Sequence, residues 1–67
     1  MKIAEILKEK RISGMQIAMK AGVAPSDFYQ AMNGKKPFFP AWRKRLSEAL
    51  DMPESECFPE YQDNKEE

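Results

Sequence analysis

Apolar residues near the start of the chain recur at the spacing of one helix face. Ile3, Ile6 and Leu7 stand three and four residues apart, with Glu5 and other long-chain helix formers between them. This periodicity predicts a first amphipathic helix over residues 3–11.

The second helix is predicted mainly from the residues at its ends. Ser13 and Gln16 match the S-x-x-Q capping box, in which each side chain accepts a hydrogen bond from the backbone amide of the other residue. The helix should therefore begin at Gly14 or Met15, and Gly22 should end it because glycine readily adopts the left-handed conformation that follows a helix. Its inner face carries Ile17, Ala18 and Ala21.

A third helix is predicted from Pro25, because the missing backbone N–H of proline costs nothing at a first helical position. Phe28, Ala31 and Met32 share one face of this helix. Asn33-Gly34 should end it, since both residue types tolerate positive φ. The polar residues of the same segment, together with one tyrosine, then face away from the core: Ser26, Asp27, Tyr29, Gln30 and Asn33.

The second half of the chain predicts one longer helix and a short closing turn. Pro40 is suited to open the helix, and residues 53–58 should form a turn that returns Phe58 to the core. Cys57 in this turn is expected to be a buried packing residue. The core-facing stripe of the longer helix is Trp42, Leu46, Ala49 and Leu50, and its other face is Arg43, Lys44, Ser47 and Glu48.

These elements predict an all-α domain, a compact bundle of four to five short helices over residues 1–58. The 67 residues allow one such domain, and the 42% apolar and 33% charged composition is typical of a soluble one. Residues 59–67 contain one aromatic and no aliphatic side chain. They cannot offset the entropy of ordering and are expected to form a disordered acidic tail.

The inventory of reactive side chains argues against an enzyme. The chain has no histidine and one cysteine, which excludes a histidine-dependent triad, an internal disulfide and a multi-cysteine metal site. We therefore expect no cofactor, no metal and no small-molecule ligand. No apolar run approaches the length that spans a membrane, so a cytoplasmic protein is expected.

Two short helices joined by a turn that contains glycine describe a helix-turn-helix. The segment IAMKAGVAPSDFYQAMNGKK closely resembles the Cro/repressor-type (XRE-type) helix-turn-helix family. The shared elements are Ile17-Ala18, Gly22-Val23, Phe28 and Asn33-Gly34-Lys35-Lys36, and LSEALDMPESECF resembles the family's fourth and closing helices. The resemblance covers residues 3–58 and implies a lambda-repressor-like fold.

The resemblance also implies a function, that of a small phage-like transcriptional regulator that binds double-stranded DNA, with repression as the expected outcome. In the family the third helix enters the major groove, which here corresponds to about residues 25–33. Gln30 is the strongest base-reading candidate, because a carboxamide can bond adenine N6 and N7 together. The full set of base-reading candidates is Pro25, Ser26, Asp27, Tyr29 and Gln30.

Phosphate contacts are expected around the same pair of helices. Backbone amides at the start of the second helix lie at its positive dipole end, where an anion is favoured. Lysine and arginine side chains nearby could add point charges, although each of them is equally a solubilising surface group. The candidates are Ser13, Gly14, Met15, Lys20, Asn33, Lys35, Lys36, Arg43 and Lys44. When bound, the protein would associate with the nucleoid, and a homodimer on two half-sites is a candidate form of the complex.

Four positions depart from the family pattern: Gly14, Pro25, Asp27 and the bulky Tyr29 stand where relatives commonly carry other residues. The first three favour an alternative hypothesis, a protein-interaction module with weak or no DNA binding that docks through Phe38, Phe39 and Tyr29. The segment Pro37-Phe38-Phe39-Pro40 cannot easily turn both rings inward. The favoured prediction places one ring in the core and the other against Trp42, with an exposed dimer or partner contact as the alternative.

The zero net charge conceals a strong asymmetry. Residues 1–50 contain ten basic and four acidic side chains, whereas residues 51–67 contain one basic and seven acidic side chains. The neutral total therefore does not exclude DNA binding. It leads to the hypothesis that the acidic end competes with phosphates and restrains non-specific binding.

Overall fold

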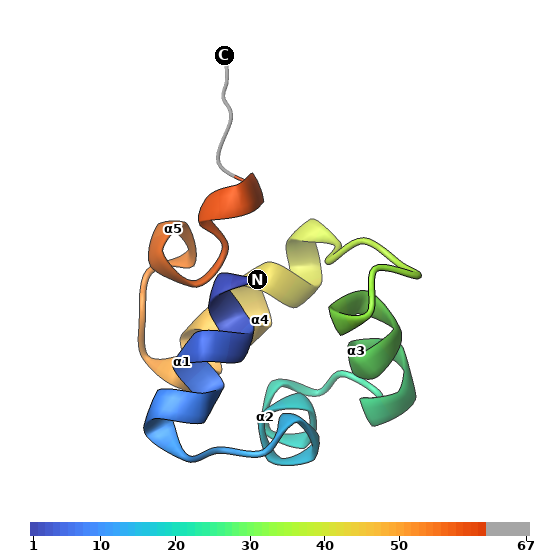
Figure 1. Cartoon of the computed structure of the whole chain (residues 1–67), viewed down its shortest axis with the longest axis horizontal. Helices are drawn as coiled ribbons and strands as arrows, with labels where there is room; N and C mark the ends of the chain where they lie inside the picture. The colour runs from blue at the N-terminus through green and yellow to red at the C-terminus, as the bar shows by residue number, and fades with distance from the viewer. Residues whose placement is uncertain (62–67) are drawn as a thin grey trace.

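Five α-helices and one 3-10 turn make up the ordered elements of the computed structural model, which describes residues 1–61 (Figure 1). They are α1 (Lys2–Lys10), α2 (Gly14–Ala21), α3 (Pro25–Met32), α4 (Pro40–Leu50), α5 (Glu54–Cys57) and η1 (Pro59–Tyr61). None of the described residues forms a strand. The prediction of an all-α bundle of short helices is confirmed.

Capping residues determine where the first two helices begin and end. α1 ends one residue earlier than predicted, because Arg11 adopts the left-handed conformation at φ 57°. The capping box is confirmed: Ser13 N–H donates to Gln16 Oε1 at 2.9 Å, and Gln16 N–H donates to Ser13 Oγ at 3.0 Å. Gly22 ends α2 at φ 76° as predicted. No atom lies within 4 Å of a Cβ built on Gly22, so its backbone conformation, not lack of space, favours glycine there.

Prolines open α3 and α4 at the predicted positions, Pro25 and Pro40. At the end of α3, Gly34 takes the positive φ of 83°, whereas Asn33 stays at φ −86°. Asp51 ends α4 in the left-handed conformation.

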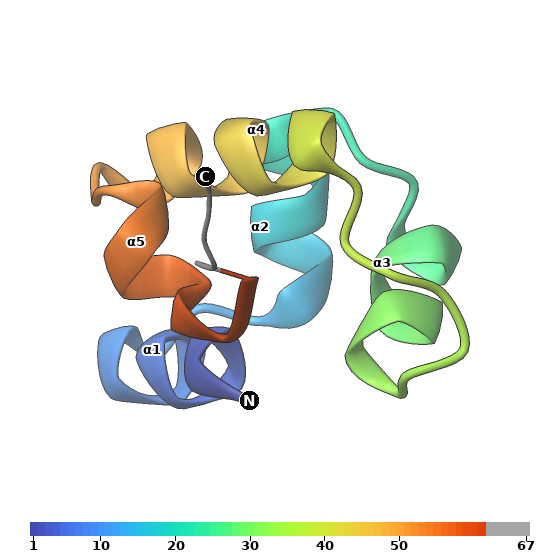
Figure 2. The same cartoon turned by 90° about the horizontal axis from the view of Figure 1, so that it is seen from above.

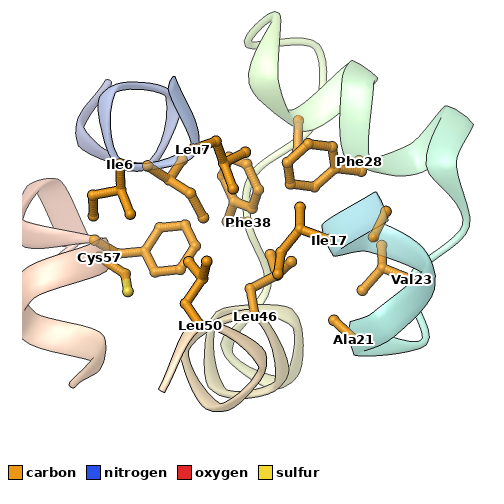
Figure 3. Close-up of a cluster of buried hydrophobic side chains, with 14 residues drawn as sticks. Ile6, Leu7, Ile17, Ala21, Val23, Phe28, Phe38, Leu46, Leu50 and Cys57 are labelled. Atoms are coloured by element: carbon orange, nitrogen blue, oxygen red, sulfur yellow. The ribbon is translucent and has the colours of Figure 1, made fainter. Parts of the chain in front are cut away.

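The core forms where α1, α2, α4 and α5 meet, and α2 packs most extensively against α4. Phe28 from α3 and Phe38 from the loop before α4 are fully buried in this core (Figure 3). Phe58, which directly follows α5, is fully buried as well. Cys57 is also fully buried, which confirms the prediction that it is a packing residue.

The face of α4 differs from the prediction at one position. Leu46 and Leu50 are buried, and Trp42 and Ala49 are half-buried against the core, as the stripe predicts. Ser47, expected to face solvent, is instead buried at 4% exposure, and its hydroxyl has no hydrogen-bond partner among the described residues. Ser47 stands three residues before Leu50 and therefore shares its buried side of α4.

The boundary predicted at residue 58 is placed too early. Pro59–Tyr61 form η1, in which the Tyr61 ring packs against Phe38 and Phe58 with centroids 6.4 and 6.1 Å apart. Glu60 Oε2 accepts a hydrogen bond from Lys2 N–H at 2.8 Å. Tyr61 Oη accepts a further hydrogen bond from Phe38 N–H at 3.1 Å. Because the Tyr61 ring and these two hydrogen bonds hold them in place, residues 59–61 belong to the folded domain. The rest of the predicted tail, residues 62–67, lies outside the described part of the chain.

Candidate nucleic-acid interface

Helices α2 and α3 are joined by the three-residue turn 22–24, and α3 stands at one end of the molecule, away from α1 and α5 (Figure 2). α3 packs mainly against α2. Much of the surface of α3 is therefore open to a partner, while its inner side is packed against α2.

The junction between these two helices is filled by small and apolar residues that also belong to the helix-turn-helix pattern. Ala18 is completely buried where α2 and α3 meet, and Val23 in the turn is 4% exposed. Phe28 is completely buried, and its ring meets the Phe38 ring edge-on with centroids 5.9 Å apart. The orientation of α3 is thus set by close packing, which tolerates little change in side-chain volume.

Gly14 and Tyr29 make a contact that the sequence did not indicate. A Cβ placed on Gly14 would lie 2.9 Å from Phe28 Cε2, 2.9 Å from Tyr29 Oη and 3.0 Å from Tyr29 Cε1. The tyrosine ring therefore lies across the first residue of α2, and it meets Phe28 edge-on at 5.7 Å. Tyr29 remains 44% exposed. In the sequence, this contact could have been predicted from a glycine at the first position of one helix and a bulky residue on the next helix.

The outward face of α3 is polar. Ser26 and Asn33 are exposed, and Gln30 is half-buried. Ser26 and Gln30 are four residues apart, so they are neighbours on one face. Pro25 is half-buried at the start of the helix. Tyr29 stands three residues after Ser26 and four before Asn33, so it lies on the same face, and its ring lies close to Gly14 of α2. The face is therefore polar apart from this one ring.

Asp27 and Lys36 form a salt bridge, with Lys36 Nζ 2.8 Å from Asp27 Oδ1. Their side chains are 36% and 41% exposed, so the pair lies at the surface beside the polar face of α3. The sequence predicts Asp27 as a base-reading residue and Lys36 as a phosphate contact, but in the structure the two side chains form an ion pair with each other.

Arg43 is already bonded to partners within the fold. Its guanidinium donates to Glu54 Oε2 at 2.9 Å and to the Phe38 carbonyl, and it lies 4.7 Å from the centre of the Tyr61 ring. With 17% of its side chain exposed, Arg43 links α4 to α5 and η1. A phosphate contact by Arg43 stays a prediction, and such a contact would have to compete with these internal partners.

The other phosphate candidates stay accessible. Gly14 is half-buried beneath Tyr29, and the remaining ones are exposed: Ser13, Met15, Lys20, Asn33, Lys35 and Lys44. The Ser13 hydroxyl already accepts from Gln16 N–H, which leaves its own O–H free to donate.

The two adjacent phenylalanines separate as the favoured prediction states. Phe38 is fully buried, whereas Phe39 is 45% exposed and meets Trp42 edge-on with centroids 4.8 Å apart. Phe38 is therefore not a dimer or partner contact, because no part of its ring reaches the surface. Phe39 is the one of the two that a partner could touch.

Tyr61 is a structural residue that sequence reasoning missed. The Phe38 N–H donates to Tyr61 Oη at 3.1 Å, so the tyrosine fixes the loop that enters α4. Through Phe38 and Phe28, a line of aromatic contacts runs from η1 to α3. A lone aromatic in an acidic stretch was the signal that could have revealed it.

Comparison with protein-family models, with curated proteins and with solved structures finds no significant match to this chain. Within residues 1–61, no helix has the length and apolar character needed to cross a membrane. The same part of the chain contains no cluster of metal-ligating side chains.

Proposed function

We propose that this protein is a sequence-specific double-stranded DNA-binding regulator that inserts α3 into the major groove. The observation that carries the proposal is the outward face of α3 beside the start of α2, where Ser26 and Asn33 are exposed and Gln30 is half-buried. Ser26 and Gln30 offer hydrogen-bonding groups of the kind that read base edges. Repression by occupying a promoter is the simplest regulatory outcome for a domain of this size.

The charge distribution supports the same proposal. Ten of the eleven basic side chains lie in residues 1–50, and Lys20, Lys35 and Lys44 are exposed on or beside α2, α3 and α4. Lysine side chains near the groove would neutralise phosphates and release counterions. A second copy on an adjacent half-site, about one helical turn away, would raise the affinity of a short reading helix.

Selection of binding sites from randomised duplex DNA, followed by fluorescence anisotropy, tests this function. We expect a defined operator whose affinity falls with salt at a log–log slope of about −0.9 for each phosphate neutralised. Gln30→Ala should relax preference at one or two base pairs, whereas Lys35→Ala should weaken binding to all sequences alike. Failure to recover any sequence, together with salt-independent binding, would contradict the proposal.

The competing hypothesis of a protein-interaction module keeps one supporting observation. Met15, Met19 and Phe39 are 53%, 67% and 45% exposed, and Tyr29 adds a fourth large exposed side chain. The burial of Phe38 removes one of its three proposed anchors. Sedimentation of the protein alone and with DNA distinguishes the two: a self-associating protein that shows no salt-sensitive DNA affinity would favour the module.

A further inference from the structure

The position of Lys36 is fixed by the backbone before its side chain reaches Asp27. Gly34 turns the chain at φ 83°, and the amides of Lys35 and Lys36 then both donate to the Gln30 carbonyl at 2.8 and 3.3 Å. Lys36 is thereby held against the last turn of α3. From there its side chain runs back along the helix to Asp27.

The salt bridge uses one of the two carboxylate oxygens. Lys36 Nζ contacts Oδ1 of Asp27, and Oδ2 accepts no hydrogen bond from any group in residues 1–61. A carboxylate without its own proton can only accept hydrogen bonds. In the major groove the matching base group is the amino group of cytosine, because the adenine amino group lies beside N7, a second acceptor that repels a carboxylate.

Lys36 also removes the main obstacle to placing a carboxylate in the groove. An isolated Asp27 would be repelled by the phosphates on both sides, whereas the ion pair as a whole is neutral. Gln30 lies three residues after Asp27, so the two side chains are neighbours on α3.

On the basis of the proposed function, we infer that Asp27 determines specificity by accepting a hydrogen bond from a cytosine N4 amino group, with Lys36 as the cation that neutralises it. The cytosine lies within about two base pairs of the adenine that Gln30 reads. The operator of this protein should therefore contain a cytosine and an adenine close together in the region under α3.

The test uses the full chain and the duplex that the wild-type protein selects, with each base pair replaced in turn. Replacing the cytosine should weaken wild-type binding about tenfold, as should a 2-pyrimidinone nucleotide that lacks only the amino group. D27A should lose this discrimination and keep the preferences at all other base pairs. D27N should shift preference at the same base pair toward adenine, because a carboxamide pairs with adenine N6 and N7.

Lys36→Met and its neighbour Lys35→Met provide the matched control, since each removes one positive charge next to α3. In the wild-type background, Lys36→Met should weaken binding several-fold more than Lys35→Met, because it also leaves Asp27 unneutralised. In the D27A background the two substitutions should cost the same. Equal costs in both backgrounds would overturn the role of Lys36.

Two outcomes separate this inference from the function on which it rests. If wild-type protein selects an operator but D27A and D27N keep every base preference, Asp27 is not a reader and the proposed function stands. If the wild-type protein shows no sequence-selective, salt-sensitive binding, both proposals are overturned. A circular-dichroism melt of each variant shows that the folded state is being compared, and D27N preserves the shape of the side chain.

Discussion

At the scale of single residues, Gly14 is the one glycine of the chain at which an added Cβ would meet close neighbours. Its missing side chain makes room for two aromatic rings, one of which, Phe28, is fully buried and cannot move away. At an ordinary helical position, alanine stabilises relative to glycine. Here the contacts reverse that preference, since any Cβ would overlap Phe28 and Tyr29.

We therefore predict that Gly14→Ala lowers the free energy of unfolding by about 1–2 kcal/mol, the usual cost of overpacking. Urea denaturation at equilibrium measures it. In a Tyr29→Ala background the cost should be smaller, because one of the two overlapping rings is gone. A more stable Gly14→Ala protein would show that the rings separate without cost.

The two ion pairs of the described residues differ in exposure and in the number of further contacts that their cation makes. Lys36 and Asp27 are 41% and 36% exposed, whereas Arg43 is 17% exposed and has two further partners, the Phe38 carbonyl and the Tyr61 ring. Exposed pairs contribute little to stability because water screens them. Sheltered, multiply bonded cations contribute more, since their removal leaves partners unsatisfied.

Accordingly, Lys36→Met should change the free energy of unfolding by no more than about 0.5 kcal/mol. Arg43→Met should lower it by about 1.5–3 kcal/mol, because a charged hydrogen-bond donor is lost from a carboxylate and a carbonyl. Thermal and urea unfolding of the two variants provide the comparison. Equal effects would indicate that the Arg43 contacts contribute nothing to stability.

At the scale of elements, η1 connects the end of the described chain to α3 through a series of aromatic contacts. Tyr61 contacts Phe38, Phe38 contacts Phe28, and Phe28 begins the second turn of α3. Removal of η1 would expose Phe38 and Phe58 and free the loop that enters α4. A short turn at the edge of the fold thus contributes to the orientation of α3.

Tyr61→Phe isolates the polar part of this contact. It keeps the ring and leaves the Phe38 N–H without its acceptor, which should lower the free energy of unfolding by about 1 kcal/mol. Tyr61→Ala should cost more, because the ring contacts with Phe38, Phe58 and Arg43 are lost as well. Amide hydrogen exchange at Phe38 should accelerate in both variants, and an unchanged exchange rate would contradict the role assigned to the hydroxyl.

At the scale of the whole molecule, charge is divided along the chain. Residues 1–50 carry a net charge of +6 and residues 51–67 carry −6. Of the acidic residues at the end, Glu54 and Glu60 are bonded within the fold, to Arg43 and to Lys2 N–H. The acidic end is therefore partly a structural component, and the hypothesis of competition with phosphates must rest on the residues after Tyr61.

Truncation should accordingly be made after Tyr61. This removes Asp63, Glu66 and Glu67 together with Lys65, and it leaves η1 in place. We expect tighter binding to non-specific DNA at low salt and little change in unfolding free energy. Truncation after Phe58 would mix this effect with loss of the Tyr61 contacts. Unchanged non-specific affinity after the cut at Tyr61 would contradict the competition hypothesis.

The sequence alone predicted the helices, because their signals are local. The capping box of Ser13 and Gln16, the prolines that open α3 and α4, and the glycine that ends α2 act over a few residues. The apolar stripes of α1 and α4 follow the helical period. Most of the core, including the buried Cys57 and Phe58, could be predicted for the same reason.

Tertiary structure alone decided which polar and aromatic residues are available to a partner. The pairings of Asp27 with Lys36, Arg43 with Glu54, and Gly14 with Tyr29 join residues nine, eleven and fifteen positions apart. No periodicity within one helix encodes such contacts, because they depend on how loops return and how helices cross. The sequence therefore predicted the helices and most of the core, and packing determined which polar and aromatic side chains are already bonded within the fold.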